Sequence, residues 1–434
     1  MSLISSMYTG ATGLESNSTD LSVIGDNIAN ANTIGFKASR ASFSDAMAQQ
    51  LIGEGSMMSQ VGLGTHLQAV QKIITQGALT NTGLATDLAV DGNGYFVVSG
   101  AHNGSTGQFY TRAGQFTLDK SGFLVNLEGL HVQGYTAGPT GIVGTTPGDL
   151  KVGNTDSPAV ASTTVNVRAN LDAAAPIIVA AWDPANPGAT SNFSNSVTVY
   201  DSLGAGHQVD VYYRKTAANT WEYHALTDGG GTTGGTAGTP VELITPPGTL
   251  TFNTNGTLLT APAATVTFNP INAAQGQPLT FNLGDPTGAA GTGLLGVTQF
   301  AAPSGTASVG QDGYSSGSLT HIAIDKEGKI NGSFTNGQSR VLGQVATAIV
   351  KAPDKMDRVG GNLFAVNPQS GQATLGAAGT AGRGGIVAGA LEQSNVDLAN
   401  EFVRMIAAQR GYQASSKTVT TADQLLAELM TLKR

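Results

Sequence analysis

Apolar side chains recur every seven residues near both ends of the chain. This spacing keeps the side chains on one stripe of an α-helix and is typical of helices that pack along a seam. The N-terminal stripe runs over residues 3–31, although Gly10 and Asn17 interrupt its flanking track. Asn30 and Gly35 tolerate left-handed backbone, so the helix should end close to them. We expect its assembly residues to be Leu3, Met7, Leu14, Leu21, Ile24 and Ile28.

The C-terminal stripe is more regular and predicts the stronger helix. Its expected assembly residues are Leu398, Phe402, Met405, Tyr412, Val419 and Leu426. Ser394 and Asp397 stand at capping-box spacing before this stripe, and Lys433 and Arg434 suit the negative end of a helix dipole. A helix within residues 395–434 would be about 55 Å long, because an α-helix rises about 1.5 Å per residue.

These two helices have two possible roles, which are core packing within one chain and assembly between copies. Ordering about 65 terminal residues costs more backbone entropy than the burial of about ten large apolar side chains returns. Two such helices alone are therefore marginal, and packing among neighbouring copies would bury further faces. We accordingly favour assembly, with the helices forming a coiled-coil-like inner layer.

Between the two ends the period changes to the alternation of β-strands. Residues 95–98, and Phe116 with Leu118, predict short strands between Gly, Asp and Asn turns. A hairpin is predicted by the alternating residues Val197, Val199, Val209, Val211 and Tyr213. An internal echo supports this interpretation, because residues 116–123 resemble residues 322–330. Each segment predicts a strand, a D-K-x-G turn and a return strand.

Residues 149–305 differ in composition from the rest of the chain. They are rich in Gly, Ala, Thr and Pro and contain both tryptophans, Trp182 and Trp221. They also hold ten acidic residues against four basic ones, which accounts for six of the eight net negative charges of the chain. We expect this segment to form a separate domain that faces solvent.

The predicted fold is α+β and multidomain, with terminal helices around β-rich middle domains, one inserted into the other. This order suggests that the two ends of the chain lie together. The predicted parts are a terminal helical assembly domain (1–30 and 395–434), a connecting region (31–75 and 386–394), an inner β domain (76–148 and 306–385) and an inserted outer β domain (149–305).

Composition narrows the class of protein. Only 12% of the residues are charged, about half of the usual quarter, and glycine is about twice as frequent as usual. A net charge of −8 argues against a nucleic-acid partner, and the lack of cysteine excludes disulfides and thiolate chemistry. The N-terminus has no basic and apolar leader pattern, and no apolar run is long enough to predict a membrane span.

No arrangement of side chains predicts an enzyme, a cofactor or a metal site. The histidines are scattered singly, at His66, His102, His131, His207, His224 and His321. Residues 87–94 lack the terminal glutamate of a calcium loop, and the glycine pairs never form a phosphate-binding loop. Asp201 and Asp210 could be a glycosidase pair, but Asp201 to Gly204 is better interpreted as a hairpin turn.

Five blocks of sequence resemble the flagellar rod and hook family. The first is DNIANANTIGFK at residues 26–37, which resembles the N-terminal signature of that family. The others are DGNGYF at 91–96, YTRAGQF at 110–116, GALEQSNVDL at 389–398 and MIAAQRGYQ at 405–413. The resemblance thus covers both ends and most of the flanking β region.

This resemblance implies a helical layer around a central channel, a connecting region and outer β domains. The inserted segment favours a hook-type member, a flexible universal joint, over the shorter rod subunits, because residues 199–204 and Trp221 resemble the hook-specific β domain. Gly411 and Ser415 depart from related chains, and the glycine should weaken the helix locally. The implied partners are further copies of the chain, the rod, hook-cap and hook–filament junction proteins, and the flagellar type III export apparatus.

Three other interpretations remain open on the sequence. A distal rod subunit with an enlarged insertion would form a straight and rigid tube, so electron microscopy separates it from a curved hook. A secreted β-rich adhesin would share the glycine and threonine content, but it would not need heptads at both ends. An enzyme is the weakest alternative, because no catalytic arrangement emerges from the sequence.

Overall fold

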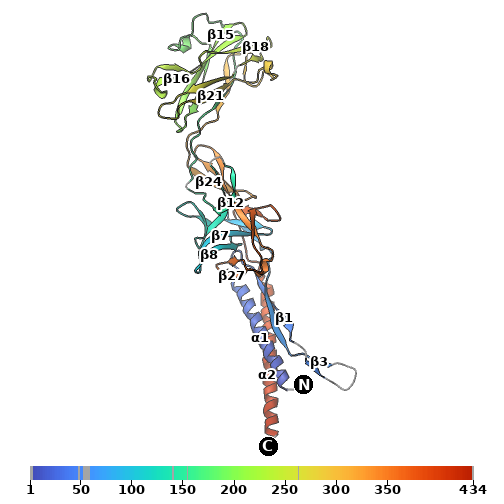
Figure 1. The fold of residues 1–434 in the computed structure, drawn as a ribbon. Coiled ribbons are helices and arrows are strands. Elements are labelled where there is room, and N and C mark those ends of the chain that lie inside the picture. The colour runs from blue at the N-terminus through green and yellow to red at the C-terminus, as the bar shows by residue number, and fades with distance from the viewer. Residues whose placement is uncertain are drawn as a thin grey trace. The chain divides into compact units, whose positions relative to one another are not determined.

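The computed structural model describes residues 3–46, 49–51, 59–138, 141–153, 155–261 and 263–432. These residues divide into two compact units (Figure 1). The first unit consists of Met1–Thr155, His321–Ser333 and Ser339–Arg434, and the second consists of Asp156–Thr320 and Phe334–Gln338.

The boundaries of the second unit differ from the predicted 149–305. Strand β23 (Gly305–Gln311) pairs antiparallel with β13 (Thr164–Asn170), so residues after 305 belong to a sheet of the second unit. Segment composition does not reveal this, because pairing between strands far apart in sequence decides which unit a strand joins.

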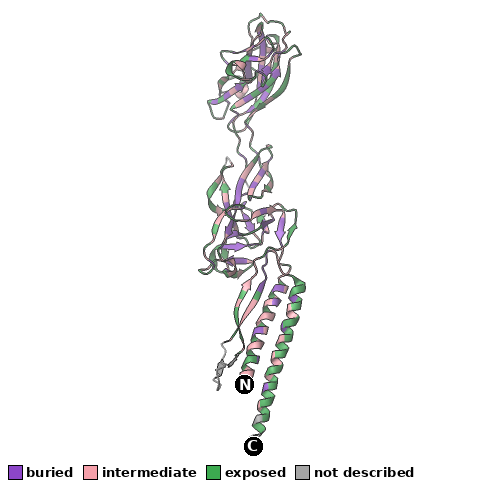
Figure 2. Ribbon diagram, turned by 90° about the vertical axis from the view of Figure 1, so that its right-hand side faces the viewer, coloured by how far each residue is buried: buried purple, intermediate pink, exposed green. Residues whose placement is uncertain are grey.

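In the first unit, α1 (Leu3–Ala29) and α2 (Leu398–Leu432) lie side by side in both views (Figures 1 and 2). They run antiparallel, because Gly10 lies near Val419 while Asn27 contacts Glu401 at the other end. The cap of α2 is Asp397, whose carboxylate accepts hydrogen bonds from the N–H groups of residues 399 and 400. Ser394, the expected cap, instead accepts from the N–H of residue 396.

A two-stranded ribbon packs against α1. Its strands are β1 (Ser39–Asp45) and β4 (Thr65–Lys72), which pair antiparallel. The hydroxyl oxygens of Ser16 and Thr65 lie 2.9 Å apart and connect the helix to the ribbon. Strands β2 (Gln49–Leu51) and β3 (Ser59–Val61) form a separate pair.

The β body of the first unit is one large antiparallel sheet with two smaller strand pairs. The sheet runs in the order β24 (Leu319–Ile324), β25 (Lys329–Phe334), β26 (Ser339–Ile349), β11 (His131–Ala137), β7 (Tyr95–His102), β8 (Ser105–Thr111), β28 (Leu363–Ala365) and β27 (Asp357–Gly360). Also paired to it are β9 (Phe116–Leu118), β10 (Leu124–Asn126), β12 (Val143–Asp149) and β29 (Thr374–Ala377). The smaller pairs are β6 (Leu88–Asp91) with β30 (Gly385–Ala388), and β5 (Leu79–Asn81) with β31 (Ala390–Glu392). A short 3₁₀ helix, η4, covers Pro353–Lys355.

The internal echo corresponds to two turns of the same kind. Asp119 accepts hydrogen bonds from the N–H groups of residues 121 and 123, and Asp325 accepts from those of residues 327 and 329. Gly122 and Gly328 follow with positive φ, which only glycine adopts at little cost. The predicted strand, turn and return strand are therefore confirmed at both places.

The second unit is a pair of sheets around one apolar core. The first sheet contains β20 (Ala264–Phe268), β21 (Gln277–Asn282), β13, β22 (Val297–Thr298) and β23. The second contains β14 (Phe193–Tyr200), β15 (Gly206–Ala217), β16 (Thr220–Asp228), β18 (Gly248–Phe252) and β19 (Leu258–Thr260), with β17 (Pro240–Glu242) beside β16. Short 3₁₀ helices cover Pro187–Ala189 (η1), Gly229–Gly231 (η2) and Thr287–Ala289 (η3).

The predicted hairpin of the second unit is confirmed. Val197 of β14 is paired with Val209 of β15, and Trp221 is fully buried in the core that both sheets share. Asp201 closes the hairpin turn by accepting the N–H groups of Leu203 and Ala205.

Candidate functional site

The two terminal helices meet through small residues. Gly10 of α1 faces Val419 of α2, where an added Cβ would lie 2.7 Å from the valine Cγ2. The same holds at Gly13, where a Cβ would lie 2.8 Å from the Ser415 hydroxyl oxygen. These spaces are too small for a side chain, so the glycines permit the close approach of the two helices.

Gly411 belongs to this seam as well. A Cβ on Gly411 would lie 2.6 Å from the side-chain oxygen of Asn17. Ala408 and Ala422, which are buried, extend the seam in both directions along α2. The sequence predicts that Gly411 weakens the helix, whereas in the structure it permits close packing against Asn17. The signal for this seam was a seven-residue row of small residues, namely Ala408, Ser415 and Ala422.

The predicted assembly residues mostly lie beside the seam rather than in it. Ile24 is fully buried, whereas Leu398, Phe402 and Tyr412 are 42%, 49% and 42% exposed. The half-buried members are Met7, Leu14, Leu21, Ile28, Met405, Val419 and Leu426. The side chain of Leu3 lies outside the described residues. The structure therefore does not gather the twelve residues into one seam within the chain, and their role in assembly stays a prediction.

Other large apolar side chains of the helices are exposed too. They are Ile4, Tyr8, Val403, Ile406, Leu425 and Met430. Figure 2 shows that most of α2 is exposed, while α1 carries more half-buried residues. This difference arises because α1 contacts α2 and the ribbon, whereas α2 packs mainly on α1. Exposed apolar surface of this extent marks an interaction site.

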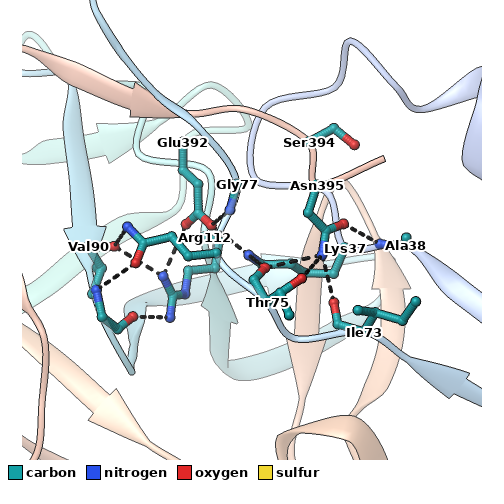
Figure 3. Close-up of polar contacts among 12 residues, drawn as sticks. Lys37, Ala38, Ile73, Thr75, Gly77, Val90, Arg112, Glu392, Ser394 and Asn395 are labelled. Carbon is teal, nitrogen blue, oxygen red and sulfur yellow. Dashed lines mark hydrogen bonds and ion pairs between the residues drawn. The ribbon is translucent and has the colours of Figure 1, made fainter. Parts of the chain in front are cut away.

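A buried polar cluster joins the helix pair to the β body. We call it the anchor and define it by Lys37, Arg112, Glu392 and Asn395 (Figure 3). Glu392 is at its centre and is fully buried. One carboxylate oxygen lies 2.5 Å from Lys37 Nζ, and the other lies 3.0 Å from a guanidinium nitrogen of Arg112. Two cations thus share one buried anion.

Hydrogen bonds to the backbone complete the anchor and tie distant segments together. Arg112 donates to the carbonyl oxygens of Val90 at 3.1 Å and Gly92 at 2.6 Å. Glu392 also accepts from the N–H of Gly77 at 2.9 Å. Because each buried charge has several partners, the cluster satisfies the condition under which buried ions are tolerated.

Asn395 connects the last residues before α2 to the segment that follows α1. Its side-chain oxygen accepts the N–H of Ala38 at 2.8 Å, and its amide nitrogen donates to the carbonyl oxygen of Ile73 at 2.9 Å. The carbonyl oxygen of Thr75 accepts from both Asn395 and Lys37. The segment that follows α1 and the segment that precedes α2 are therefore fastened at one place, as Figure 3 shows.

A second buried contact fixes the end of the helix pair next to the anchor. Asn27 of α1 exchanges two hydrogen bonds with the backbone of Ser39, at 2.7 and 2.9 Å. Its amide nitrogen also lies 3.2 Å from a carboxylate oxygen of Glu401 in α2. This contact therefore ties α1 to the ribbon and to α2 at the same point.

Burial shifts the pKa of Lys37 in the anchor and of Asp20 between the two helices. Burial lowers the pKa of Lys37, while its hydrogen bond to Glu392 opposes this effect by favouring the charged amine. In the helix seam, burial raises the pKa of Asp20, and Arg404, whose guanidinium lies 3.6 Å from the carboxylate, works against the shift. These charged groups affect how the segments pack together. None of them is arranged as a reactive group.

The remaining candidate chemistry has structural explanations. His207 Nε2 lies 3.0 Å from a carboxylate oxygen of Asp201, so the aspartate of the supposed glycosidase pair holds a turn and a histidine. Within the part of the chain that the structure describes, no three His, Asp or Glu side chains gather as a metal site would require.

The sequence pattern did not predict the anchor residues as a site. Lys37, Arg112, Glu392 and Asn395 all lie within the blocks that resemble the rod and hook family, but far apart along the chain. In a chain with so few charges, a charged residue inside each block was the available signal. Only the tertiary structure shows that these charges meet.

Comparison with known families identifies the class of this chain. Four family models match: "Flagella basal body rod protein" over residues 7–37, "Flagellar hook protein FlgE/F/G D1 domain" over 89–170, "Flagellar basal body protein FlaE D2 domain" over 170–314, and "Flagellar basal body rod FlgEFG protein C-terminal" over 387–432. Together with the paired terminal helices, they define a protein of the flagellar rod and hook class.

Full-length relatives narrow this class further. The flagellar hook protein FlgE of Escherichia coli is 36% identical, over 97% of this chain and 98% of its own length. That of Salmonella typhimurium is also 36% identical, over 99% of this chain and all of its own. The chain therefore belongs to the flagellar hook protein FlgE family and is a structural subunit of the bacterial flagellar hook.

The crystal structure of Helicobacter pylori flagellar hook protein FlgE2 is 16% identical in sequence to this chain, with a TM-score of 0.48. The match covers 71% of this chain and 98% of that chain.

Among the described helices, neither α1 nor α2 is long and apolar enough to cross a membrane.

Proposed function

We propose that copies of this chain polymerise through the helix pair into a flexible tube that joins the flagellar rod to the filament. The observation that carries this proposal is the exposure of Leu398, Phe402 and Tyr412 beside a seam of small residues. Holding large apolar side chains in water stabilises nothing in a single chain. A neighbouring copy would bury them.

The proposed assembly surface consists of the twelve residues expected from the sequence. They are Leu3, Met7, Leu14, Leu21, Ile24, Ile28, Leu398, Phe402, Met405, Tyr412, Val419 and Leu426. Most of them flank the close contact of α1 with α2, so one copy leaves them accessible to the next. In a polymer the helix pairs would form a coiled-coil-like inner layer.

The anchor supports this role by making the helix pair and the β body one mechanical piece. Glu392 holds Lys37 and Arg112 from two other segments, and Asn395 lies directly before α2. We infer that bending of the tube occurs at contacts between copies, because the anchor resists movement within a copy.

The second unit is proposed to be the inserted outer domain, and the residues next to the helices the connecting region. Copies would leave the cell through the flagellar type III export apparatus and assemble outside it. Their partners would be the rod, the hook cap and the hook–filament junction proteins. These assignments rest on membership of the family and on the order of parts along the chain.

Electron microscopy of the purified chain under polymerising conditions tests the proposal. We expect curved tubes from the natural chain and none from Phe402→Asp, because a carboxylate in a contact between copies is costly to desolvate. The matched control is Gln424→Asp, on the exposed face of α2 that is turned away from α1. It should still form tubes.

Circular dichroism of both variants should match that of the natural chain, which separates lost assembly from lost folding. Tubes from Phe402→Asp at the same protein concentration would overturn the proposed surface. Straight, rigid tubes from the natural chain would favour a rod subunit instead.

A further inference from the structure

The helix pair has two different flanks, and their residues follow from the seam. Successive residues of an α-helix turn by about 100°. In α1, the seam is set by Gly10 and Gly13. Rotation about the helix axis from this seam, in the sense of increasing residue number, leads to the stripe of Met7, Leu14 and Leu21. All three of these side chains are half-buried.

In α2, the same rotation from the seam at Ala408 and Ser415 leads to Leu398, Phe402 and Tyr412. Because the helices are antiparallel, this rotation leads to the same side of the pair on α1 and on α2. We call this side the apolar flank, and it consists of Met7, Leu14, Leu21, Leu398, Phe402, Met405 and Tyr412.

The opposite flank is built differently on its two helices. On α1 it is covered by the ribbon, through contacts such as that between Ser16 and Thr65. On α2 it forms an open groove of about 480 Å³ next to the start of α1. The groove is lined by Ser6, Ala414, Lys417, Thr418, Thr421, Ala422 and Leu425.

We propose that the apolar flank of one copy docks into the groove of the next copy. This inference rests on the proposed function and adds which surface meets which. Large side chains such as Phe402 and Tyr412 suit a groove lined mostly by alanine, threonine and serine, with Lys417 and Leu425 beside them, in the way that knobs enter holes between helices. The partner is therefore a second copy of this chain.

Charge supports the same pairing. Lys417 lines the groove, and Asp423 is exposed toward the apolar flank of the same helix. Neither side chain has an ion pair within the described residues of this chain. The two flanks of α2 therefore present an anion and a cation respectively.

Symmetry also favours contact between unlike flanks. If two apolar flanks met each other, the contact would be self-complementary and would close a dimer. A contact between unlike surfaces leaves one free surface at each end, so further copies can add to form a ring or a helical array. A tube needs such a contact.

Cysteine cross-linking tests the inference, because the natural chain has no cysteine. Tyr412→Cys places a thiol on the apolar flank, and Thr418→Cys places one in the groove. Each variant is assembled alone and in an equal mixture, checked for tubes by electron microscopy, and treated with a short bismaleimide. Gln424→Cys, which lies on neither flank, is the matched control.

We expect cross-linked dimers in the mixture at least tenfold above either variant alone, and none above background when Gln424→Cys replaces one partner. Dimers from Tyr412→Cys alone would show that like flanks meet, and tubes without cross-links in the mixture would show that these flanks do not meet. Either result overturns the inference while leaving the proposed function intact. If the natural chain forms no tubes, the proposed function itself fails. Phe402→Cys replaces Tyr412→Cys if the latter does not assemble.

Discussion

Large side chains are buried in the second unit but exposed in the helix pair. In the second unit, Tyr213, Trp221 and Tyr223 are fully buried between two sheets. In the helix pair, Phe402 and Tyr412 remain exposed while glycine, alanine and serine form the seam. The first arrangement is complete within one chain, whereas the second leaves apolar surface that other copies can cover. A subunit of the proposed flexible polymer would use both kinds of region.

The largest effect is expected at the anchor, which connects the helix pair to the rest of the first unit. Glu392→Gln leaves the buried cations of Lys37 and Arg112 without their anion, at a cost of about 3–5 kcal/mol in the free energy of unfolding. Urea unfolding followed by circular dichroism measures it. Glu128→Gln, in a partly exposed pair with His102, is the control and should cost about 0–1 kcal/mol.

A double variant tests whether the loss of stability in Glu392→Gln comes from charge. Adding Lys37→Met to Glu392→Gln removes one of the two uncompensated cations, so the double variant should recover part of the lost stability. If the double variant is less stable than Glu392→Gln, the loss comes from packing rather than from charge.

A cavity in the second unit should have a similar but local effect. Trp221→Ala removes a fully buried ring and should lower the free energy of unfolding of this unit by about 3–5 kcal/mol. Calorimetry of the full chain should show one transition moved to lower temperature and the other unchanged. Tubes should still form at temperatures where the second unit stays folded, and their complete loss there would contradict the separation of the two regions.

A smaller loss is expected when the helix seam is made bulkier. In Gly411→Val the added side chain meets Asn17, and overpacking of this kind costs about 1–3 kcal/mol. The helices must then move apart, so tube formation should require a higher protein concentration. Sedimentation of assembled material measures this. Gln424→Val, in the same helix but exposed and on neither flank, should change the concentration less.

The smallest effect is a dependence on pH at Asp20. Its pKa is raised by burial, so the folded chain holds this proton more tightly than the unfolded chain. The stability that this group contributes is present below its ordinary pKa of 3.8 and is lost as the pH rises through the higher folded value. Asp20→Asn lacks this loss. Urea midpoints across this interval should therefore fall with pH for the natural chain relative to the variant, and parallel curves would contradict the assignment.

Several features could be predicted from local pattern alone. The periods of seven and two predict the terminal helices and the β-rich middle, because each records which side of an element is apolar. The hairpin that pairs Val197 with Val209, and the turn at Asp201, were likewise predictable, because adjacent strands and turn residues interact over short distances in sequence. The family, too, was predicted from short blocks of sequence.

The tertiary structure decided what those apolar sides contact. The heptad that includes Leu398 and Tyr412 predicts an apolar stripe, but it does not show which surface that stripe contacts. Within the chain, the contact between the helices is formed by Gly411 and Ala408 instead. The anchor could not be read from the sequence for the same reason. Glu392 lies more than 350 residues from Lys37, and only folding removes both charges from water at one place, where each becomes costly unless the other is present.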